Sequence, residues 1–357
     1  QWNPAVRAND YYLEVATDTG FTNVVFGQWI GNYIGVNLSG FGNDGQQYYW
    51  RVAARNLLGT SPYSNTWSFV NGTPPPPPPP TCISTYGSGI GVLGDNKTHI
   101  DTCRDSGSGI YYLYDSSRRA NNNPHGHNGQ MLSNAGIETS DYFSGVIVDN
   151  DNVWDAANQA SGVDAHVYAA KVYDYLLNSS KGWSLNSFDG NGSSMNTMVE
   201  YSSPNDAGWN PNSLYVYFGV GSDKKPFSGA LDAVGHEWAH GVTQYASNLN
   251  YEKESGALNE AFSDWMGTAV EYFYGESNWT MGEGIVIIRD LQNPLNPILA
   301  NVVINGQTYD FRQPDTYGGY LWYPTIGCTP TSYNDWCGVH TNSGVSNKMF
   351  YLLSQGG

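Results

Sequence analysis

Apolar side chains recur at helical spacing in the second half of the chain. Between residues 231 and 245 they stand three or four positions apart, at Leu231, Val234, Trp238, Val242 and Tyr245. An α-helix has about 3.6 residues per turn, so this spacing predicts a helix with one apolar face against a core. The stretch after Ser255 predicts a second helix, whose apolar face consists of Phe262, Trp265, Ala269 and Phe273.

The first 72 residues show the two-residue period of β-strands instead. From residue 48 to residue 55, one set of side chains (Tyr48, Trp50, Val52, Ala54) alternates with another, which predicts a strand with one buried face. Residues 11–17 predict another strand. The run Y-x-W-R-V-x-A-x-N-x-x-G at 48–59 resembles a strand and turn of fibronectin type III domains. This resemblance implies an all-β, immunoglobulin-like sandwich that lacks its opening strand.

A run of seven prolines, Pro74–Pro80, separates this module from the rest of the chain. Such a run favours polyproline II, in which it extends roughly 22 Å. Proline runs also bind SH3-type domains, but we favour a linker because other features indicate an extracellular chain. The sequence therefore predicts a multidomain protein with a module at 1–72, a linker at 73–81 and a larger domain at 82–357.

The helix predicted at 231–245 carries a metal-binding motif on its polar side. His236 and His240 are four residues apart, so their side chains lie about 40° apart around the helix axis. They are roughly 160° from the centre of the apolar stripe, which directs both imidazoles towards a cleft. Two imidazoles at this spacing bind one zinc ion, and Glu237 between them can act on water at the metal.

Catalytic zinc usually has three protein ligands and one open position. We expect the third ligand to be Glu260, on the second predicted helix. Glu260 shares one helix face with Asp264 and Glu271, and three acids in one stripe repel each other unless a cation lies beside them. The alternative interpretation of this stripe is a solvated acidic surface.

These motifs and their flanking residues resemble those of the thermolysin-like zinc metallopeptidases. G-H-E-W-A-H-G-V-T at 235–243 is followed, 20 residues after the second histidine, by the glutamate of E-S-G-A-L-N-E-A-F-S-D at 254–264. Further stretches match in the same order, at 91–97 (G-V-L-G-D-N-K), 163–175 (V-D-A-H-V-Y-A-A-K-V-Y-D-Y) and 338–348 (G-V-H-T-N-S-G-V-S-N-K). The resemblance begins near Thr85 and implies an α+β peptidase with two lobes and zinc between them.

The resemblance implies a role for each residue around the metal. Glu237 corresponds to the general base, while Asp264 and Asn259 correspond to residues that hydrogen-bond the histidine ligands and fix their ring orientation. The implied zinc ligands are His236, His240 and Glu260.

The resemblance extends to groups that act on the substrate. Tyr251 and His340 correspond to residues that stabilise the oxyanion, and Asp335 corresponds to the acid that orients this histidine. Arg289 corresponds to an arginine that binds a substrate backbone carbonyl. Peptide hydrolysis needs an activated water, a polarised carbonyl and donors at the oxyanion, so these roles form a complete set.

Substrate-binding positions are implied as well. Asp206, Ala207 and Trp209 correspond to the substrate edge strand, where the family commonly has Asn instead of Asp206. A carboxylate there accepts a hydrogen bond from the leaving amine but, unlike Asn, cannot donate one. The pocket for the residue after the scissile bond is expected to favour large apolar side chains, with core packing as the alternative. Its implied lining is Phe227, Ile285, Ile288 and Met281.

Calcium is expected beside the same helices. Of the family's double calcium site, three acids are present (Asp232, Glu271 and Glu283), whereas intervening acids are replaced by Asn278 and Thr280. Fewer carboxylates hold two dications less well, so we expect a single calcium ion. Asp149 and Asp151 form a weaker candidate, with a solvated acidic turn as the alternative.

The composition is consistent with a secreted enzyme. The net charge of −17 and the isoelectric point near 4.5 argue against nucleic-acid and anionic-membrane partners. No apolar run is long enough to span a membrane. The chain starts at Gln1 with neither a methionine nor a visible signal peptide, so we expect a processed chain or a fragment.

Four cysteines support an extracellular location. They allow three pairings, of which the local one is simplest: Cys82 with Cys103 and Cys328 with Cys337. Their spacing contains no C-x-x-C motif of a zinc site. Disulfides indicate an oxidising compartment, and the second one would stiffen the loop that leads to His340.

Taken together, these features predict a secreted zinc endopeptidase that cleaves peptides or proteins, with an N-terminal module that binds an extracellular polymer or surface. The alternatives are a non-catalytic surface or adhesive protein with a peptidase fold, and a structural fragment of a larger assembly. A degraded site would favour the first alternative, yet Glu237, Tyr251, Asp335 and His340 are all present. Because the family continues for several helices beyond the position of Gly357, we expect a helical lobe that is cut short.

Overall fold

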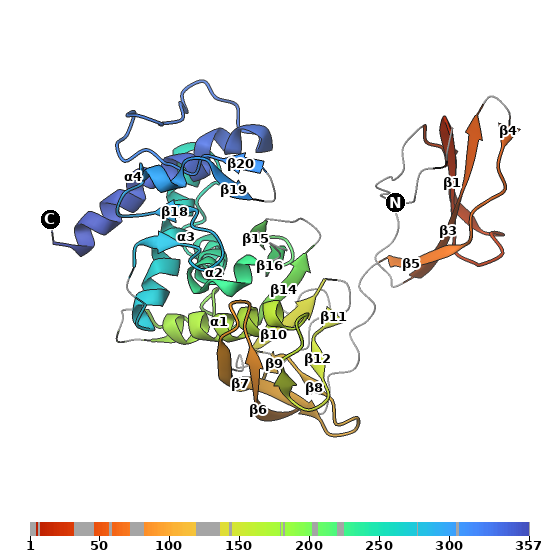
Figure 1. Ribbon diagram of the computed structural model, residues 1–357, viewed down its shortest axis with the longest axis horizontal. Coiled ribbons are helices and arrows are strands. Elements are labelled where there is room, and N and C mark those ends of the chain that lie inside the picture. Colours follow the sequence, from red (N-terminus) through yellow and green to blue (C-terminus); the bar gives the residue numbers. More distant parts are fainter. Residues whose placement is uncertain are drawn as a thin grey trace. The chain divides into compact units, whose positions relative to one another are not determined.

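The computed structural model describes residues 5, 8–31, 46–56, 59–71, 82–118, 136–142, 145–178, 180, 183–201, 206–219, 225–276, 278–304 and 307–356. Contacts between Cα atoms divide the chain into two units, Gln1–Pro78 and Pro79–Gly357, which are described separately (Figure 1). The proline run predicted to be a linker lies outside the described residues.

The described part of the first unit is one antiparallel sheet. Strand β1 (Asp10–Ala16) lies between β2 (Val24–Trp29) and β3 (Gln46–Asn56), and both β4 (Gly59–Thr60) and β5 (Trp67–Asn71) pair with β3. The strands predicted at 11–17 and 48–55 thus correspond to β1 and β3. Leu13, Val15 and Tyr48 form its small buried cluster. A sandwich needs a second sheet, and the described residues of this unit contain only this one.

The second unit begins with two sheets. The first has the order β12-β8-β7-β6-β13 and is built on the long hairpin of β6 (Cys82–Ile90) and β7 (Asn96–Asp105). Its short strands are β8 (Tyr111–Tyr112), β12 (Val148–Asp149) and β13 (Val153–Trp154). The second sheet has the order β11-β10-β14-β16-β15, with β9 paired to β10, and it ends at β15. Its strands are β9 (Tyr114–Asp115), β10 (Ile137–Asp141), β11 (Gly145–Val146), β14 (Met195–Tyr201), β15 (Ala207–Asn210) and β16 (Tyr215–Gly219).

Helices make up most of the remaining structure. Helix α3 (Lys253–Phe273) packs against both α2 (Leu231–Tyr245) and α4 (Asp335–Ser354), while α1 (Ala160–Leu177) packs against α2 and the second sheet (Figure 1). Two small hairpins lie between α3 and α4 in the sequence. They are β17 (Thr280–Met281) with β18 (Arg289–Asp290), and β19 (Val302–Ile304) with β20 (Gln307–Tyr309). The short 3₁₀ helices are η4 (Phe227–Gly229), η5 (Pro297–Leu299) and η6 (Ser332–Asn334).

Helix α2 is the centre of the core. It spans the predicted residues, and the side chains of Val234 and Trp238 on its apolar stripe are fully buried. Tyr245, at the end of the stripe, is half exposed and packs its ring against Phe188. The polar side of the helix is covered as well, because α3 crosses it. His236 is therefore only 5% exposed.

Glycines allow α2 and α3 to approach each other closely. A Cβ atom added to Gly235 would lie 2.9 Å from the Cα of Gly267, and one added to Gly267 would lie 2.3 Å from the carbonyl oxygen of Asp232. Backbone therefore lies against backbone at this crossing. The approach brings His236, one residue from Gly235, within reach of the acids on α3.

We expect Gly267→Ala to destabilise the protein, because its new methyl group meets the α2 backbone, which cannot rotate away. Overpacking of this kind costs about 1–3 kcal/mol, which outweighs the gain of about 1 kcal/mol in helix propensity. Thermal unfolding followed by circular dichroism would measure the loss. Gly162→Ala on α1 is the control, because its methyl group meets mainly the end of the Ile147 side chain, which can move. Equal melting temperatures for the two variants would contradict the close crossing.

Candidate metal centre and catalytic cleft

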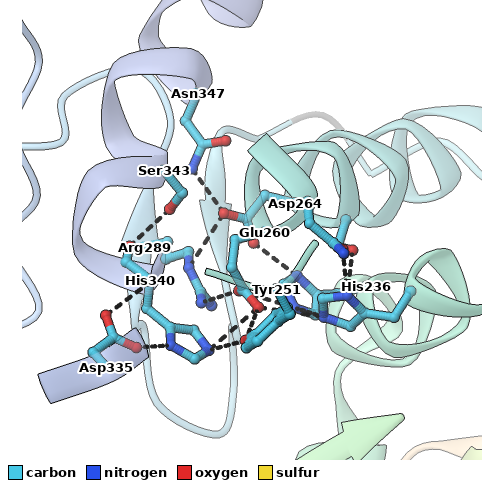
Figure 2. Close-up of polar contacts among 12 residues, drawn as sticks. His236, Tyr251, Glu260, Asp264, Arg289, Asp335, His340, Ser343 and Asn347 are labelled. Atoms are coloured by element: carbon cyan, nitrogen blue, oxygen red, sulfur yellow. Dashed lines mark hydrogen bonds and ion pairs between the residues drawn. The ribbon is translucent and has the colours of Figure 1, made fainter. Parts of the chain in front are cut away.

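Three side chains converge where α2 and α3 cross. The Nε2 atoms of His236 and His240 are 3.1 Å apart, and the two carboxylate oxygens of Glu260 each lie 3.5 Å from one of them. Ligand atoms around a tetrahedral zinc with bonds of 2.0–2.1 Å are about 3.3 Å apart, so these separations fit zinc. Figure 2 shows His236 and Glu260 pointing towards each other from their two helices.

Hydrogen bonds fix which ring nitrogens face the centre. The side-chain amide of Asn259 donates to the carbonyl of Leu249, so its oxygen accepts from Nδ1 of His240 at 2.8 Å. Asp264 accepts from Nδ1 of His236 at 2.8 Å. With protons on both Nδ1 atoms, the facing Nε2 atoms need a cation between them, either a proton or a metal ion. The nearby carboxylate of Glu260 makes this donor set suitable for zinc.

Arg289 links the two acids of α3. Its guanidinium group lies 3.1 Å from Glu260 and 3.2 Å from Asp264, and Asn347 of α4 donates to Asp264 at 2.7 Å (Figure 2). Burial alone would raise the pKa of Glu260, but the charges of His340, His240, His236 and Arg289 lower it below its usual range. The resemblance implies only a substrate contact for Arg289 and gives no role to Asn347, because neither link is visible in sequence spacing.

Glu237 is a buried acid next to the three converging side chains. Burial and the charge of Glu260 raise its pKa to about 7, against the opposing charges of His236 and Arg289. A dication nearby would lower this pKa, since it favours the carboxylate. The carboxylate form, which a dication favours, is the form that can accept a proton from water.

Tyr251 and His340 lie beside the same centre and line one of its cavities together with Glu237. The hydroxyl of Tyr251 donates to Glu260 and lies 3.2 Å from Nε2 of His340. Nδ1 of His340 is 2.5 Å from Asp335, whose other oxygen accepts from the His340 backbone at 2.9 Å (Figure 2). Burial would lower the pKa of His340, but the charge of Glu260 and the bond to Asp335 raise it to about 9. Half of the side chain is exposed, so water screens part of this effect.

The backbone of His340 is also held in place, by a buried glutamine side chain. Gln313, which is 5% exposed, donates to the carbonyl of His340 at 2.6 Å and to the hydroxyl of Ser343 at 2.9 Å. Gln313 is not among the residues predicted from the sequence, because it lies far from every motif in the sequence. The resemblance to the metallopeptidases was identified from short matching stretches, and residue 313 lies in none of them.

Two cavities meet at Glu237, His236 and His340. The first, which we call the Met281 cavity, has a volume of about 320 Å³ and includes the predicted Phe227, Ile288 and Arg289. Ile285 is not among its lining residues and packs instead against the main core. Part of the wall comes from β19, β20 and the segment after them, which the sequence analysis did not anticipate: Ile304, Tyr309, Asp310, Phe311, Arg312 and Gln313.

The second cavity, which we call the Trp336 cavity, has a volume of about 780 Å³. Ala207 of β15 and Asp206, which directly precedes the strand, border both cavities, whereas Trp209 lines only this one. The predicted edge-strand residues are thus brought together beside Glu237. The lining also includes Tyr251 and Trp336.

Three further acids cluster at the other end of the helix crossing. Ligand atoms of Asp232, Glu271 and Glu283 lie within 4.8 Å of one another. Burial, together with the charges of neighbouring acids, raises the pKa of Asp232 to about 8 and that of Glu271 to about 9. Glu283 accepts from Thr280, and Glu271 accepts from Asn278 at 3.4 Å. This arrangement favours a cation among the acids.

The other acidic candidate has a different character. One oxygen of Asp149 accepts from the backbone nitrogens of both Asp151 and Asn152 at 2.8 Å, and the other accepts from Gln159 at 3.0 Å. These bonds describe a hydrogen-bonded turn, and the described residues show no metal-binding group here. The geometry therefore favours the alternative that the sequence analysis left open.

One predicted disulfide is present in the described residues. Cys328 and Cys337 are bonded, with their Cα atoms 6.1 Å apart, in the loop that precedes His340. Cys103 is disulfide-bonded, but the side chain of its predicted partner Cys82 lies outside the described residues. Among the described helices, none has the length and apolar character needed to cross a lipid bilayer.

Paired histidines on one helix opposite a glutamate on the next are the arrangement of a metallopeptidase. The family model of the thermolysin metallopeptidase catalytic domain matches residues 86–244, and that of the alpha-helical domain matches residues 247–357. The chain belongs to the thermolysin metallopeptidase family.

Similar proteins include the thermostable neutral protease NprT of Geobacillus stearothermophilus, which is 38% identical over 289 residues. A thermolysin of Alicyclobacillus acidocaldarius subsp. acidocaldarius is 37% identical over 289 residues. Each of these alignments covers 77% of this chain and 45% of the relative, so the chain spans less than half of their length. The precursor of protealysin, a metalloproteinase from Serratia proteamaculans, is 26% identical with a TM-score of 0.48, over 62% of this chain and 68% of that one.

Proposed function

We propose that this chain carries the catalytic centre of a secreted zinc endopeptidase, which hydrolyses peptide bonds with an activated water. The observation that carries the proposal is the convergence of His236, His240 and Glu260 beside the buried acid Glu237, where two cavities meet. The names of the relatives, neutral protease and thermolysin, support the same activity.

The zinc ligands and Glu237 have different roles in the proposed reaction. A zinc ion held by the three ligands would act as a Lewis acid, which lowers the pKa of a water molecule and polarises the substrate carbonyl. Glu237 accepts the proton of the attacking water and returns it to the leaving amine. Its position within the metal-binding motif keeps the acid next to both reacting groups.

The groups opposite Glu237 stabilise the developing negative charge. The hydroxyl of Tyr251, which donates to Glu260 in the free protein, lies 3.2 Å from Nε2 of His340, and both groups can donate to an oxyanion once the substrate is bound. Asp335 holds Nδ1 of His340, so Nε2 faces the cleft. The intact geometry of these groups argues against a non-catalytic scaffold.

We place the substrate along β15, the last strand in the order of its sheet. An extended peptide adds to a sheet edge through backbone hydrogen bonds, and Ala207 borders both cavities at this edge. The carboxylate of Asp206 can accept a hydrogen bond from the leaving amine. The Met281 cavity then receives the residue after the scissile bond, and its apolar lining favours a large apolar side chain.

We propose that Asp232, Glu271 and Glu283 bind one calcium ion. Calcium prefers oxygen ligands, which the three carboxylates supply. A dication between the carboxylates would offset their mutual repulsion. The carbonyl and hydroxyl oxygens of neighbouring residues would complete the coordination. Calcium bound here would stabilise the helix crossing next to the catalytic centre.

We further propose the division into a fibronectin type III-like module at 1–72, a linker at 73–81 and a peptidase domain at 82–357. The disulfide between Cys328 and Cys337 supports an oxidising, extracellular location. The N-terminal module would bind an extracellular polymer or surface. The net charge of −17 argues against a nucleic-acid partner.

Replacing Glu237 by Gln is expected to leave zinc bound and to lower peptide turnover about 10²- to 10⁴-fold, because the base is lost while the ligands remain. Replacing His236 or Glu260 should instead remove the metal. Zinc content by atomic absorption and hydrolysis of a generic peptide by the whole protein measure both effects. Glu252→Gln, an exposed acid at the start of α3, is the control. Undiminished hydrolysis after zinc is removed with phenanthroline would refute the proposal.

Peptides with Leu or Phe after the scissile bond should be cleaved about ten- to a hundredfold faster than those with Gly, because each buried CH₂ contributes about 0.8 kcal/mol. Ile288→Ala is expected to lower this preference. Ile285→Ala serves as the matched control, since Ile285 packs in the core beside the cavity without lining it. Cleavage profiling on a peptide library measures the ratio, and a preference for Asp or Glu at this position would contradict the assignment.

Calcium removal with zinc retained is expected to lower the melting temperature. Calcium at a concentration of about 100 times its Kd raises the free energy of unfolding by about 2.7 kcal/mol, and this contribution is lost when calcium is removed. Glu271→Gln should abolish this calcium response and raise the stability of the calcium-free protein, because one of the repelling charges is gone. Asp149→Asn tests the other acidic turn and should leave the response intact. Differential scanning calorimetry with and without calcium distinguishes these outcomes. A calcium response that survives Glu271→Gln would disprove the site.

A further inference from the structure

The Trp336 cavity contains an aromatic side chain to which the roles proposed so far assign nothing. Trp336 lies in the turn between η6 and the regular part of α4, just before His340. It lines the cavity together with Trp209, Leu249 and Tyr251. A volume of about 780 Å³ is within the usual range for ligand-binding cavities.

The backbone at Trp336 has an uncommon conformation. Asp335, Trp336, Cys337 and Gly338 have φ values of 53°, 49°, 69° and 81°, so four successive residues are left-handed. Each non-glycine residue in this region costs about 1–2 kcal/mol, and such strain persists only where the surroundings enforce it. The conformation therefore needs several restraints.

Those restraints are present on both sides of the indole. Cys337 is bonded to Cys328, and its backbone nitrogen donates to the side chain of Asn334 at 3.1 Å. The backbone nitrogen of Trp336 donates to the carbonyl of Thr331 at 2.8 Å. A Cβ atom on Gly338 would lie 2.6 Å from the Cβ of Tyr323, so only glycine fits there. The turn is thus fixed independently of what the indole contacts.

The two tryptophans that line the cavity differ in the contacts that their side chains make. The indole of Trp209 donates to Gln244 at 2.8 Å and packs against the rings of Phe188 and Trp238. Trp336 is 42% exposed, and within the described part of the chain its ring neither stacks on another ring nor makes a side-chain hydrogen bond. A rigidly held indole with an open face in the cleft is suited to contact a substrate side chain.

We propose that Trp336 is a specificity-determining residue, which packs against an aromatic or large aliphatic side chain that precedes the scissile bond. The occupant is the substrate itself, because the Trp336 cavity shares His236, Glu237 and His340 with the Met281 cavity, while most of its other lining residues differ. This inference rests on the proposed function, which places the residue after the scissile bond in the Met281 cavity. The disulfide between Cys328 and Cys337 then serves specificity as well as stability.

The test compares Trp336→Ala and Trp336→Phe with the wild-type whole protein. The substrates are peptides with Leu after the scissile bond and either Phe or Gly at each of the two positions before it, varied one at a time. We expect wild type to favour Phe at one of these positions about tenfold in kcat/KM, Trp336→Ala to lose most of this ratio, and Trp336→Phe to retain most of it. A ratio within one enzyme is independent of the fraction of active protein.

Tyr333→Ala is the matched control. Tyr333 lies three residues earlier in the same loop, is fully exposed and does not line the cavity, so its removal should leave the ratio unchanged. A Phe-to-Gly ratio that is equal in wild type and Trp336→Ala would overturn the inference while the proposed function stands. Absence of zinc-dependent hydrolysis by wild type would overturn both.

Discussion

The close crossing of α2 and α3 is the constraint on which the rest of the site depends. Gly235 and Gly267 let the two backbones touch, and this separation sets how far Glu260 stands from His236 and His240. A larger side chain at either glycine would move the carboxylate away from the imidazoles. The geometry of the metal centre is therefore a consequence of backbone packing, and the ligand side chains only complete it.

The same crossing explains why acids can line one face of α3. Glu260 and Asp264 are offset by Arg289 and by the histidines, whereas Glu271 joins Asp232 of α2 and Glu283 at the other end. Each helix thus contributes to two groups of converging ligand atoms. The second group places three acids close together in a buried environment, which is costly unless a cation is present, and the first brings two imidazole nitrogens together beside a buried carboxylate. The stability of the crossing and the binding of cations are consequently linked.

The loop before α4 positions His340 beside the candidate metal centre. His340 is distant in sequence from the three ligands, so its position depends on contacts between separate segments. Asp335 binds its ring and backbone, Gln313 binds its carbonyl, and the disulfide at Cys337 fixes the left-handed turn between them. These restraints come from three separate segments. Since the side chain itself is half exposed, its orientation depends on them more than on packing.

The sequence by itself determined the local features of this protein. The spacing of apolar residues predicted α2, and the interval between His236 and His240 predicted their shared face, because both depend only on the pitch of a helix. The alternation in β1 and β3 and the pairing of Cys328 with Cys337 also follow from residues close in sequence. Glu260 is expected as the third ligand from the acidic stripe of the second helix, and the resemblance to the metallopeptidases added Tyr251 and His340 to the candidates. Their convergence is visible only in the structure.

Only the tertiary structure decided the features that depend on long-range packing. Arg289 bridges Glu260 and Asp264. Ile285 and Ile288 both pack against the core, but only Ile288 lines the Met281 cavity, and the segment around Gln313 forms part of its wall. The spacing of residues does not predict these contacts, because each one joins segments that are far apart in the sequence. Trp336 is the clearest example: no motif or spacing in the sequence singles it out, and only a strained, disulfide-held turn places its indole in the cleft.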